Sequence, residues 1–427
     1  MSIPQMIRDR LADPGIVAIL GGGALLVIFG LLAPILMNRA QEPYSTDFLV
    51  FYVSGQQLFE AEDVYASKPF DVLGPIPEGE NVPDADMNAN LNPPFTVLLL
   101  APLSRLPFAH AYAIWSLVSL ACAGAAAWLL AGAYASAQRR FLLTTGFLVL
   151  LFAYSPTWVS VVLGQTTLLV FLILAAGWRL ARSGHEPGAG AVLGAALAVK
   201  PFVGVLLIYF LARRRWRLLA WYGGSFAAAN LVAAAFMGPG VFFRYLQLLR
   251  DVTWHGMDMN ASIFGLLARL ADDADSVGNR SMLETGQGML ILAYGISLLL
   301  LGLLFPLSSR LPAWPSRQAD DIGFSVCLVL MLLISPLGWV YYFPILLICI
   351  LVIFHESRTL TRAWLYRTAA GAGWLISGIL YFFEPGEPGA AIPYSPFHVP
   401  DIYTGSLILI AVTLTLLGGR TGRKSGP

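Results

Sequence analysis

The sequence carries little charge for its length. Of its 427 residues, 12% are Asp, Glu, Lys or Arg, while 57% are hydrophobic. That charged share is about half of what soluble domains have, and a water-soluble core cannot bury so much apolar surface in a chain of this size. The densest basic stretch is Arg213–Arg217. The composition therefore argues against an ordinary soluble protein and gives nucleic-acid binding little support.

Cysteine is scarce, and several familiar motifs are missing. The three cysteines lie inside apolar runs, where small buried side chains are expected rather than disulfides or metal ligands. They are Cys122, Cys327 and Cys349. The sequence has no Walker loop, no nucleotide-binding glycine-rich turn, no His-Glu-x-x-His and no nucleophile elbow. These absences argue against ATP-driven transport and metalloprotease activity, and we predict no cofactor and no metal.

Two acidic groups could still hold a divalent cation. Asp84 and Asp86 are one residue apart, and paired carboxylates are suitable oxygen ligands. Their surroundings are typical of a loop, which favours a solvated loop over a metal site. The same interpretation applies to Asp272, Asp273 and Asp275.

Long apolar runs are what the sequence has in abundance. Runs of about 20 apolar residues recur from end to end, and that length crosses the hydrocarbon layer of a bilayer. We predict an all-α polytopic membrane protein, a single integral membrane domain with about ten full spans. The predicted spans are 16–37, 109–134, 141–160, 165–182, 217–237, 287–306, 322–336, 338–354, 364–383 and 401–419. The first run is too long for a signal peptide, so we expect it to be retained.

Two further apolar stretches, 93–104 and 188–211, do not fit a full span. The first is short and bounded by prolines, and the second is interrupted at Lys200-Pro201, where proline removes a helix hydrogen bond. If both are re-entrant hairpins, all the arginine clusters and both termini face the cytoplasm, as the positive-inside rule favours. If both are full spans, several of these clusters face outside. We prefer the hairpins, whose backbone is tolerated where protein or water covers it.

The long polar loops then all face the exterior. They comprise residues 38–92, 238–286 and 384–400, and the cytoplasmic links are short. We therefore expect the working surface on the periplasmic or extracellular face. Inside the membrane, Gly190, Gly194 and Ala198 recur at four-residue intervals, which predicts close helix packing.

The first outer loop contains an informative carboxylate, Asp47. It begins a predicted amphipathic helix over residues 47–60, which we expect to lie on the membrane surface. The interfacial aromatics of that helix are Phe48, Phe51, Tyr52 and Phe59. A carboxylate at the mouth of a membrane cavity suits a general base that takes a proton from an acceptor hydroxyl. It equally suits a helix N-cap, and spacing alone favours the cap.

Several basic side chains could hold a phosphate group. Lys200 is a lysine within an apolar stretch, where a charge is costly unless it is partnered. It could neutralise a lipid phosphate or merely cap the break at Pro201. Arg244, Arg250 and His255 lie among aromatics in the second outer loop, and arginine makes planar, bidentate phosphate contacts. The alternative is an interfacial helix with outward arginines.

Amides and aromatics could recognise a sugar. Gln165 and Asn260 lie at the outer ends of apolar segments, where they could bind sugar hydroxyls or hold helices together. Trp339, Tyr341 and Tyr342 could stack on a sugar ring, and an aromatic belt at the membrane interface explains them equally well. We include Tyr52 of the first loop among the candidate substrate-binding residues.

Six landmarks in one order resemble glycosyltransferase family 87, a set of GT-C-type membrane enzymes that use polyprenyl-phosphate sugars. The resemblance covers about residues 40 to 355. The landmarks are D-F-x-x-F-Y-x-x-G-Q-Q-L (47–58), N-P-P-F-x-x-L-L-L-A-P-L (92–103), S-P-T-W-x-x-x-x-x-G-Q-T-T-L-L (155–169), G-A-A-L-A-V-K-P (194–201), N-A-S-I-F-G-L-L-A-R-L (260–270) and S-P-L-G-W-V-Y-Y (335–342). In the family, a histidine commonly follows the last element, and here Tyr341 or Tyr342 takes its place.

The resemblance implies a GT-C fold with an active-site cavity at the outer membrane face, and it maps the family aspartate onto Asp47. It implies a glycosyltransferase of the bacterial inner membrane that works on the periplasmic side. The donor would be a polyprenyl-phosphate sugar, the acceptor a lipid or glycan, and the reaction an inverting displacement with Asp47 as the base. Lys200, Arg244, Arg250 and His255 are the candidates that stabilise the leaving phosphate.

Two classes of protein that catalyse no reaction are alternatives to this interpretation. A flippase or transporter for a lipid-linked sugar would also use re-entrant hairpins and an outward cavity. Against it, the sequence has no visible inverted repeat and few cytoplasm-facing polar groups to build a second gate. The other class is a non-catalytic subunit of an envelope-polysaccharide complex, which should tolerate a change at Asp47.

Overall fold

The computed structural model is helical over the residues that it describes, which are 14–65, 90–250, 252, 255–257, 259–271, 286–309, 317–379 and 401–421. Extended pairing in this part of the chain is limited to an isolated bridge between Asn260 and Trp339. The helices are α2 (Pro14–Arg39), η1 (Pro43–Ser45), α3 (Phe48–Phe59), α5 (Pro94–Leu100), η3 (Ala101–Arg105), α6 (Phe108–Tyr134), α7 (Ala137–Phe152), α8 (Ser155–Val162), α9 (Thr167–Arg182), α10 (Glu186–Val199), η4 (Pro201–Gly204), α11 (Val205–Ala212), α12 (Trp216–Met237), α13 (Gly240–Arg250), α14 (Ile263–Leu270), α15 (Gln287–Ser309), α16 (Arg317–Leu333), η7 (Val340–Ile345), α17 (Leu346–Glu356), η8 (Ser357–Thr359), α18 (Ala363–Ile379) and α19 (Asp401–Thr421). The all-α prediction is confirmed.

Among the described helices, five are long and apolar enough to cross a membrane. They are α2, α6, α12, α15 and the run Val340–Thr359. A sixth span results if the bent pair α7 and α8 is one crossing. A polytopic helical membrane protein is therefore shown. The count of about ten spans stays a prediction, because other apolar helices are shorter, such as Ile402–Gly418.

The predicted span 141–160 is broken in the structure. Arg139–Phe152 and Ser155–Val162 meet at a bend of 77°. Pro156 stands in the first turn of α8 and Tyr154 is extended, because proline cannot donate the hydrogen bond that would continue α7. The Tyr154 hydroxyl shares a hydrogen bond with Ser377 Oγ at 2.7 Å, and its ring stacks on Trp374. These contacts with α18 fix the bend.

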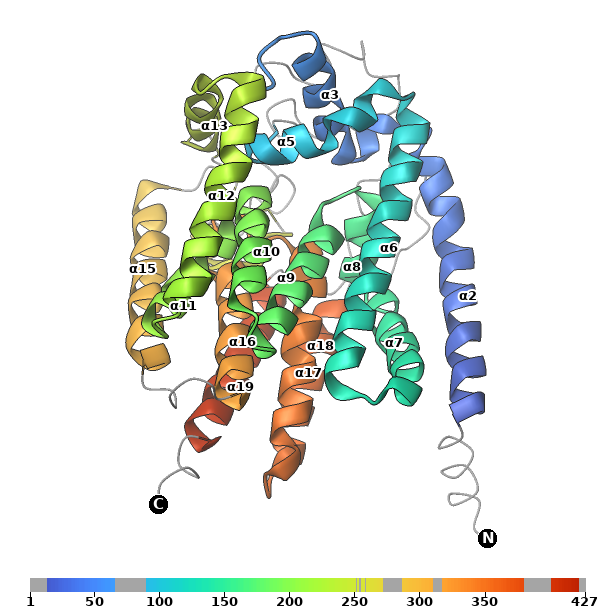
Figure 1. Ribbon diagram of the computed structural model, residues 1–427, viewed down its shortest axis with the longest axis vertical. Coiled ribbons are helices and arrows are strands. Elements are labelled where there is room, and N and C mark those ends of the chain that lie inside the picture. Colours follow the sequence, from blue (N-terminus) through green and yellow to red (C-terminus); the bar gives the residue numbers. More distant parts are fainter. Residues whose placement is uncertain are drawn as a thin grey trace.

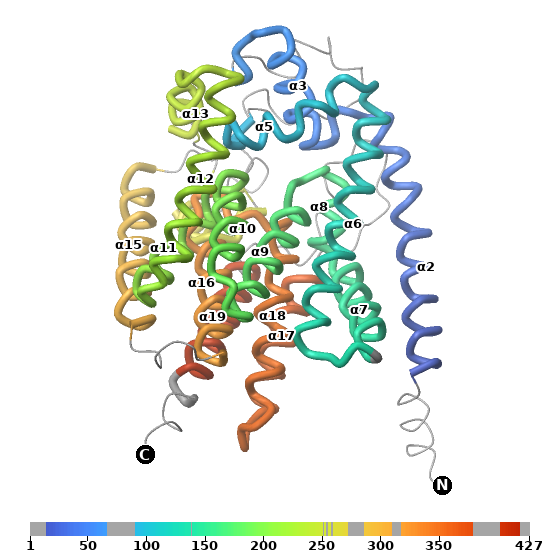
Figure 2. Tube along the Cα trace, viewed as in Figure 1, coloured from blue at the N-terminus to red at the C-terminus, as the bar shows by residue number. Residues whose placement is uncertain are grey.

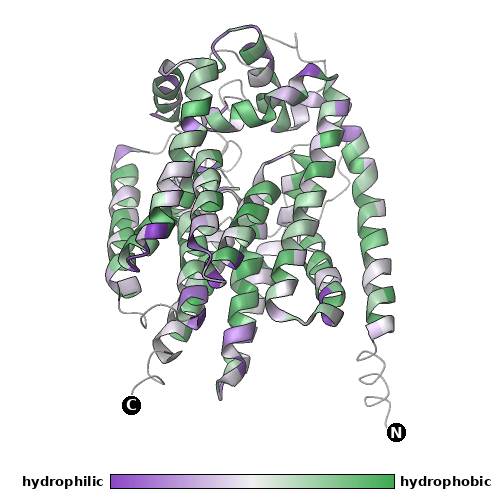
Figure 3. Cartoon of the chain, viewed as in Figure 1, coloured by the Kyte–Doolittle hydropathy of each residue, from purple (hydrophilic) through white to green (hydrophobic). Residues whose placement is uncertain are grey.

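The bundle has two different ends (Figure 1). Helices α3, α5 and α13 lie across one of them, which we call the loop end. The opposite end carries the last turns of α9, α11 and α17 and the first turn of α12, and the tube in Figure 2 shows the same division. Arg179 and Arg182 close α9, and Arg213 and Arg215 flank the turn into α12. We call this the arginine end. Hydrophobic residues cover the helices between the two ends (Figure 3).

Helices α10 and α11 form a hairpin that starts and finishes at the arginine end. Arg215 Nε lies 2.9 Å from Glu186 Oε1, so an ion pair joins the first residue of α10 to the N-cap residue of α12. Lys200 stands between α10 and η4, at the tip of the hairpin. This arrangement is the one that a re-entrant stretch requires. That the hairpin re-enters the membrane stays a prediction.

Two aspartates at the start of α16 lock the arginine end. Asp320 Oδ1 lies 3.2 Å from Arg213 Nη2, and Asp321 Oδ2 lies 3.1 Å from Arg182 Nε. Tyr209 donates a hydrogen bond to Asp320, and Trp178 donates one to Asp321. Both aspartates are buried, so each charge is partnered as burial demands. The sequence alone did not point to Asp320 or Asp321.

Helix α3 has the expected length but not the expected surroundings. Phe48, Phe51 and Tyr52 are buried in the protein, and Phe59 at its end is exposed. Gly55 brings α3 within contact of Ala101 in η3, where an added Cβ would lie 2.9 Å from the Ala101 backbone. The prediction that Phe48, Phe51 and Tyr52 are interfacial is therefore wrong, because these rings pack against η3 and α6. That the helix lies on the membrane surface stays a prediction.

The small residues of α10 let α12 approach closely, as predicted. A Cβ added at Gly190 would collide with the carbonyl oxygen of Leu218, and one at Gly194 with that of Tyr222. Both obstacles are backbone atoms, which cannot swing aside as a side chain would. Close backbone approach of this kind is what small residues permit in membrane bundles.

We predict that Gly194→Val lowers the free energy of unfolding by about 1–3 kcal/mol, because the new side chain overpacks the α10–α12 contact. Gly224→Val in α12 is the matched control, since open space surrounds its Cβ position, and it should change stability by less than about 0.5 kcal/mol. Thermal unfolding of the purified protein in one detergent measures both. Equal midpoints for the two variants would contradict the packing argument.

Candidate active site

Asp47 stands between η1 and α3 at the loop end. It occupies the N-cap position of α3, yet its side chain makes no capping hydrogen bond. Its Oδ2 instead accepts a hydrogen bond from Gln165 Nε2 at 2.6 Å. Thr46 fixes the preceding turn by donating from its hydroxyl to the carbonyl oxygen of Pro43. The carboxylate is therefore directed at another segment, and the capping interpretation is wrong.

Gln165 is placed by a turn whose backbone oxygens are all in use. The carbonyl of Leu163 accepts from the backbone N–H of Phe48, 2.9 Å away. Tyr112 donates to the carbonyl of Val162, and Trp115 donates to that of Gly164. Gly164 has φ +69° and a Cβ there would lie 2.6 Å from Phe48 Cβ, so this position needs glycine. The start of α3 and the turn before α9 are thus locked together.

Lys200 is buried at the tip of the α10–α11 hairpin. Its Nζ donates to Asn92 Oδ1 at 2.6 Å and lies 5.2 Å from the ring centroid of Tyr342. Thr96 of α5 donates to the carbonyl of Val199, which ties the same tip to α5. An ammonium removed from water is expensive unless such partners replace the lost hydration. The position of Lys200 is therefore fixed by the loop end.

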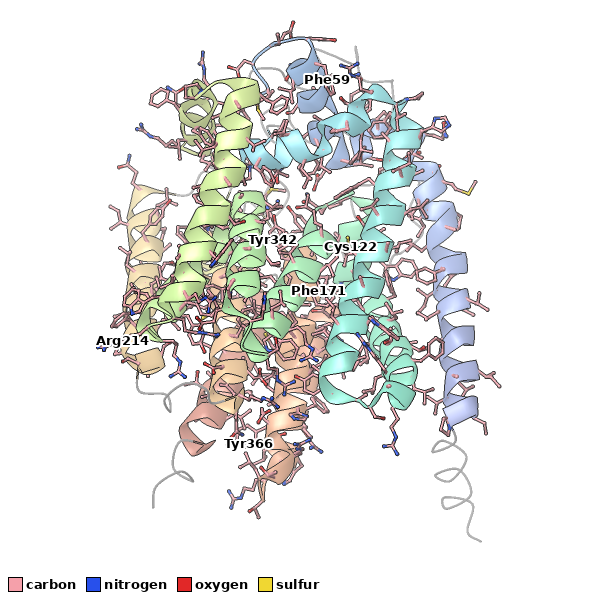
Figure 4. All side chains as sticks on the ribbon, viewed as in Figure 1. Phe59, Cys122, Phe171, Arg214, Tyr342 and Tyr366 are labelled. Carbon is pink, nitrogen blue, oxygen red and sulfur yellow. The ribbon has the colours of Figure 1, made fainter. Side chains whose placement is uncertain are left out.

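The 3-10 helix η7 brings two tyrosines to the same place. The Tyr342 ring centroid lies 5.2 Å from Lys200 Nζ. The ring centroids of Tyr341 and Tyr342 are 4.7 Å apart, and that of Trp339 is 6.0 Å from Tyr341. All three side chains are buried, and Figure 4 shows Tyr342 inside the bundle rather than at its rim. This does not fit an aromatic belt. We call Asp47, Gln165, Lys200, Tyr341 and Tyr342 the loop-end cluster.

The cluster sets the acidity of Asp47. Burial raises the pKa of its carboxyl above the ordinary value, while the Gln165 hydrogen bond and the charge of Lys200 lower the pKa. Burial is the largest of these effects, and a carboxylate with a raised pKa is a stronger base. The Asp47 residue as a whole is partly exposed. The cluster therefore combines a carboxyl group that can take up a proton with the amino group of Lys200.

Tyr52 and Asn260 lie outside this cluster. The Tyr52 hydroxyl donates to the carbonyl of Leu106 at 2.8 Å, and its ring packs on Phe108. Asn260 Nδ2 donates to the carbonyls of His255 and Pro336, and its Oδ1 accepts from two backbone N–H groups. The Asn260 amide is fully occupied by backbone, and we assign it the interhelical role that the sequence left open.

The other phosphate-binding candidates are dispersed. Arg244 Nε lies 3.3 Å from Asp63 Oδ2 on the exposed side of α13. Arg250 is the last residue of that helix. His255 is buried, with its ring 5.9 Å from that of Phe264. Of the four candidates, Lys200 is the one whose charge acts on Asp47.

The candidate metal ligands Asp84, Asp86, Asp272, Asp273 and Asp275 lie outside the described residues. So does the third outer loop, 384–400. The buried cysteines are as expected, since Cys122, Cys327 and Cys349 are all free thiols in the core.

Sequence reasoning missed Asn90 and Asn92. Asn90 Nδ2 donates to Ser54 Oγ at 2.8 Å, and Asn90 Oδ1 accepts from Asn92 Nδ2 at 2.9 Å. Asn92 Oδ1 then accepts from Lys200. The two amides thus connect α3 to the hairpin tip through a chain of hydrogen bonds. The sequence signal for these two amides was the N-L-N-P-P stretch (90–94). Its N-P-P part was interpreted as a family landmark and not as part of a site.

Comparison with known proteins fits this arrangement. The profile of glycosyltransferase family 87 matches residues 90–336, more than half of the chain. The chain belongs to glycosyltransferase family 87. A relative in Mycobacterium tuberculosis, named polyprenol-phosphate-mannose-dependent alpha-(1-2)-phosphatidylinositol pentamannoside mannosyltransferase, is 27% identical over 349 residues, covering 76% of this chain and 72% of its own. No solved structure matches the chain significantly.

The occupied amide of Asn260 generates a stability prediction. Asn260→Ala should lower the free energy of unfolding by about 1–3 kcal/mol, because it leaves buried backbone groups unpaired. Asn230→Ala is the control, since that amide donates to Phe226 of its own helix, and it should be nearly neutral. Thermal unfolding reports both. A stable Asn260→Ala protein with a raised KM for the sugar acceptor would instead make Asn260 a substrate ligand.

Proposed function

We propose that this family 87 member transfers a sugar from a polyprenyl-phosphate donor to a hydroxyl of a lipid or glycan acceptor, on the periplasmic face of a bacterial inner membrane. The observation that carries the proposal is the Asp47 carboxylate at the loop end, which Gln165 orients and its own helix leaves unused. The relative's name supplies the donor class. The arginine end would face the cytoplasm, as the positive-inside rule favours.

The proposed reaction is a direct, inverting displacement. Asp47 accepts the proton of the acceptor hydroxyl while that oxygen bonds to the anomeric carbon. The bond from the anomeric carbon to the phosphate oxygen breaks, and polyprenyl phosphate leaves with the electron pair. Lys200 stabilises the growing phosphate charge, which an ammonium in a low-dielectric site does effectively. The leaving group is a phosphate monoester, so the proposed reaction calls for no metal.

Aromatic side chains complete the proposed donor site. Trp339 and Tyr341 stack with an interplanar angle of 27°, and Tyr342 lies between Tyr341 and Lys200. A sugar bound along these rings would have its phosphate near the ammonium and its anomeric carbon near Asp47. We leave Arg244 and Arg250 out of this site, because α13 places them toward solvent.

The first experiment compares wild type with Asp47→Asn in nanodiscs, using synthetic polyprenyl-phosphate sugars and a membrane acceptor extract. We expect Asp47→Asn to lower the rate by about 10²–10⁴-fold, the usual contribution of a positioned base, with donor binding kept. Asp63→Asn is the matched control, since that outer-loop carboxylate pairs with Arg244. It should retain turnover within about twofold.

Other outcomes separate the competing classes. Equal product from wild type and Asp47→Asn would contradict the assignment of the base. Movement of a fluorescent lipid-linked sugar across the bilayer without product would indicate a transporter. A protein that neither transfers nor moves the lipid would indicate a non-catalytic subunit.

A pH profile tests the electrostatics of Asp47. Transfer needs the ionised carboxylate, so kcat/KM should fall as the pH drops through its pKa, which burial places above the ordinary value of about 4. Lys200→Met removes a charge that lowers this pKa, so the acid limb of the profile should move to higher pH. The limb is measured from initial rates at fixed donor. A limb that stays in place or moves to lower pH would show that Asp47 does not titrate in the reaction.

A further inference from the structure

The turn that carries Gln165 holds a group of unpartnered polar atoms. Within the described part of the chain, Ser160 Oγ, Gln165 Oε1, Thr166 Oγ1 and Thr167 Oγ1 have no hydrogen-bond partner. Gln165 is 6% exposed and the other three are 0% exposed. A buried polar group left without a partner costs about 1–3 kcal/mol. Four such groups within eight residues need a reason.

A different conformation of the turn does not explain these unpartnered polar groups. The carbonyls of Val162, Leu163 and Gly164 are held by bonds from α6 and α3, as described above. Thr166 is the N-cap residue of α9, and its hydroxyl does not make the capping bond that threonine usually makes there. These three backbone carbonyls are therefore satisfied, while the three hydroxyls and Oε1 of Gln165 remain without partners.

The orientation of the Gln165 amide follows from its partner. A carboxylate can only accept hydrogen bonds, so the NH₂ group must face Asp47 and the carbonyl oxygen must face elsewhere. Oε1 of Gln165 is then a free acceptor on the same amide group as the Nε2 atom that binds Asp47. It is suited to a hydroxyl that neighbours the one facing Asp47.

We propose that the turn from Ser160 to Thr167 is a subsite for the sugar hydroxyls next to the attacked hydroxyl of the acceptor. The ligand class is a neutral polyol, since the turn offers hydroxyls and one amide oxygen but no charged side chain. Hydroxyl groups can both donate and accept, which matches neighbouring sugar hydroxyls. A simple lipid alcohol would engage Asp47 and leave the turn empty. This inference rests on the proposed transferase function.

The test removes single hydroxyl groups from the acceptor and, separately, removes their proposed hydrogen-bonding partners from the protein. The donor is polyprenyl-phosphate mannose, and the acceptors are octyl mannoside, its monodeoxy analogues and octanol. For wild type, loss of a hydroxyl beside the attacked one should lower kcat/KM about tenfold to a hundredfold, the equivalent of a lost buried hydrogen bond. Octanol should be a poorer acceptor still.

The variants are Ser160→Ala and Gln165→Met. For each variant we expect at least one monodeoxy analogue that is used about as well as octyl mannoside. The kcat/KM for octyl mannoside divided by the kcat/KM for that analogue should then be close to one. Gln165→Met also disturbs Asp47, which slows both acceptors alike and cancels in the ratio. Thr415→Val is the control, because Thr415 is exposed and its hydroxyl donates to the carbonyl of Ala411 in its own helix, α19; this variant should keep the wild-type ratio.

Two results would overturn the subsite. One is a wild type that uses octanol, or every analogue that keeps the attacked hydroxyl, as well as octyl mannoside. The other is a pair of variants that lose activity without any change in the ratios.

A binding measurement keeps the subsite testable if wild type transfers no sugar at all, a result that counts against the proposed function itself. Saturation-transfer NMR of methyl mannoside with nanodisc-embedded protein should show sugar signals for wild type and weaker ones for Ser160→Ala. Equal signals for both proteins, or none for wild type, would overturn the subsite.

Discussion

A cation inside an apolar hairpin must be partnered, and the bond between Lys200 and Asn92 meets that demand. The 2.6 Å contact joins the tip of the α10–α11 hairpin to Asn92, two residues before α5 begins. Through Asn90 and Ser54 the same chain of bonds reaches α3. Three segments far apart in the sequence are therefore held at the loop end by the cost of leaving one ammonium unsolvated.

The arginine end supplies the opposite anchor. Both feet of the hairpin are tied there, Glu186 to Arg215 and Arg213 to Asp320. Buried ion pairs add little net stability, yet losing one partner of such a pair is costly. Their effect here is on the position of the hairpin. Because both of its ends are fixed at the arginine end and it packs against α12 through Gly190 and Gly194, its tip is held in one place relative to the rest of the bundle.

The sequence predicted what periodicity and composition control. Apolar runs predict the helices, the arginine pattern predicts one charged end, and the sequence motifs identify Asp47, Gln165 and Lys200 as candidates. Their convergence could not be predicted, since it depends on a turn at Gly164 and a break at Pro201 whose orientation spacing does not reveal. The burial of Phe48, Phe51 and Tyr52 could not be predicted, because an aromatic face looks the same in the sequence whether lipid or protein covers it. The pairing of Asp320 with Arg213 and of Asp321 with Arg182 could not be predicted, since the partners lie more than a hundred residues apart in the sequence.

The loop-end cluster holds two opposite charges without pairing them directly. Asp47 is bonded to the neutral amide of Gln165, and Lys200 to the neutral amide of Asn92. A direct ion pair would lower the pKa of the carboxyl and weaken it as a base. It would also occupy the ammonium that the proposed leaving phosphate needs. Amides orient both groups without forming an ion pair with either, so the carboxyl and the amino group each remain available to a substrate. Under the proposed reaction, this separation is what lets one small cluster accept a proton and stabilise an anion in the same step.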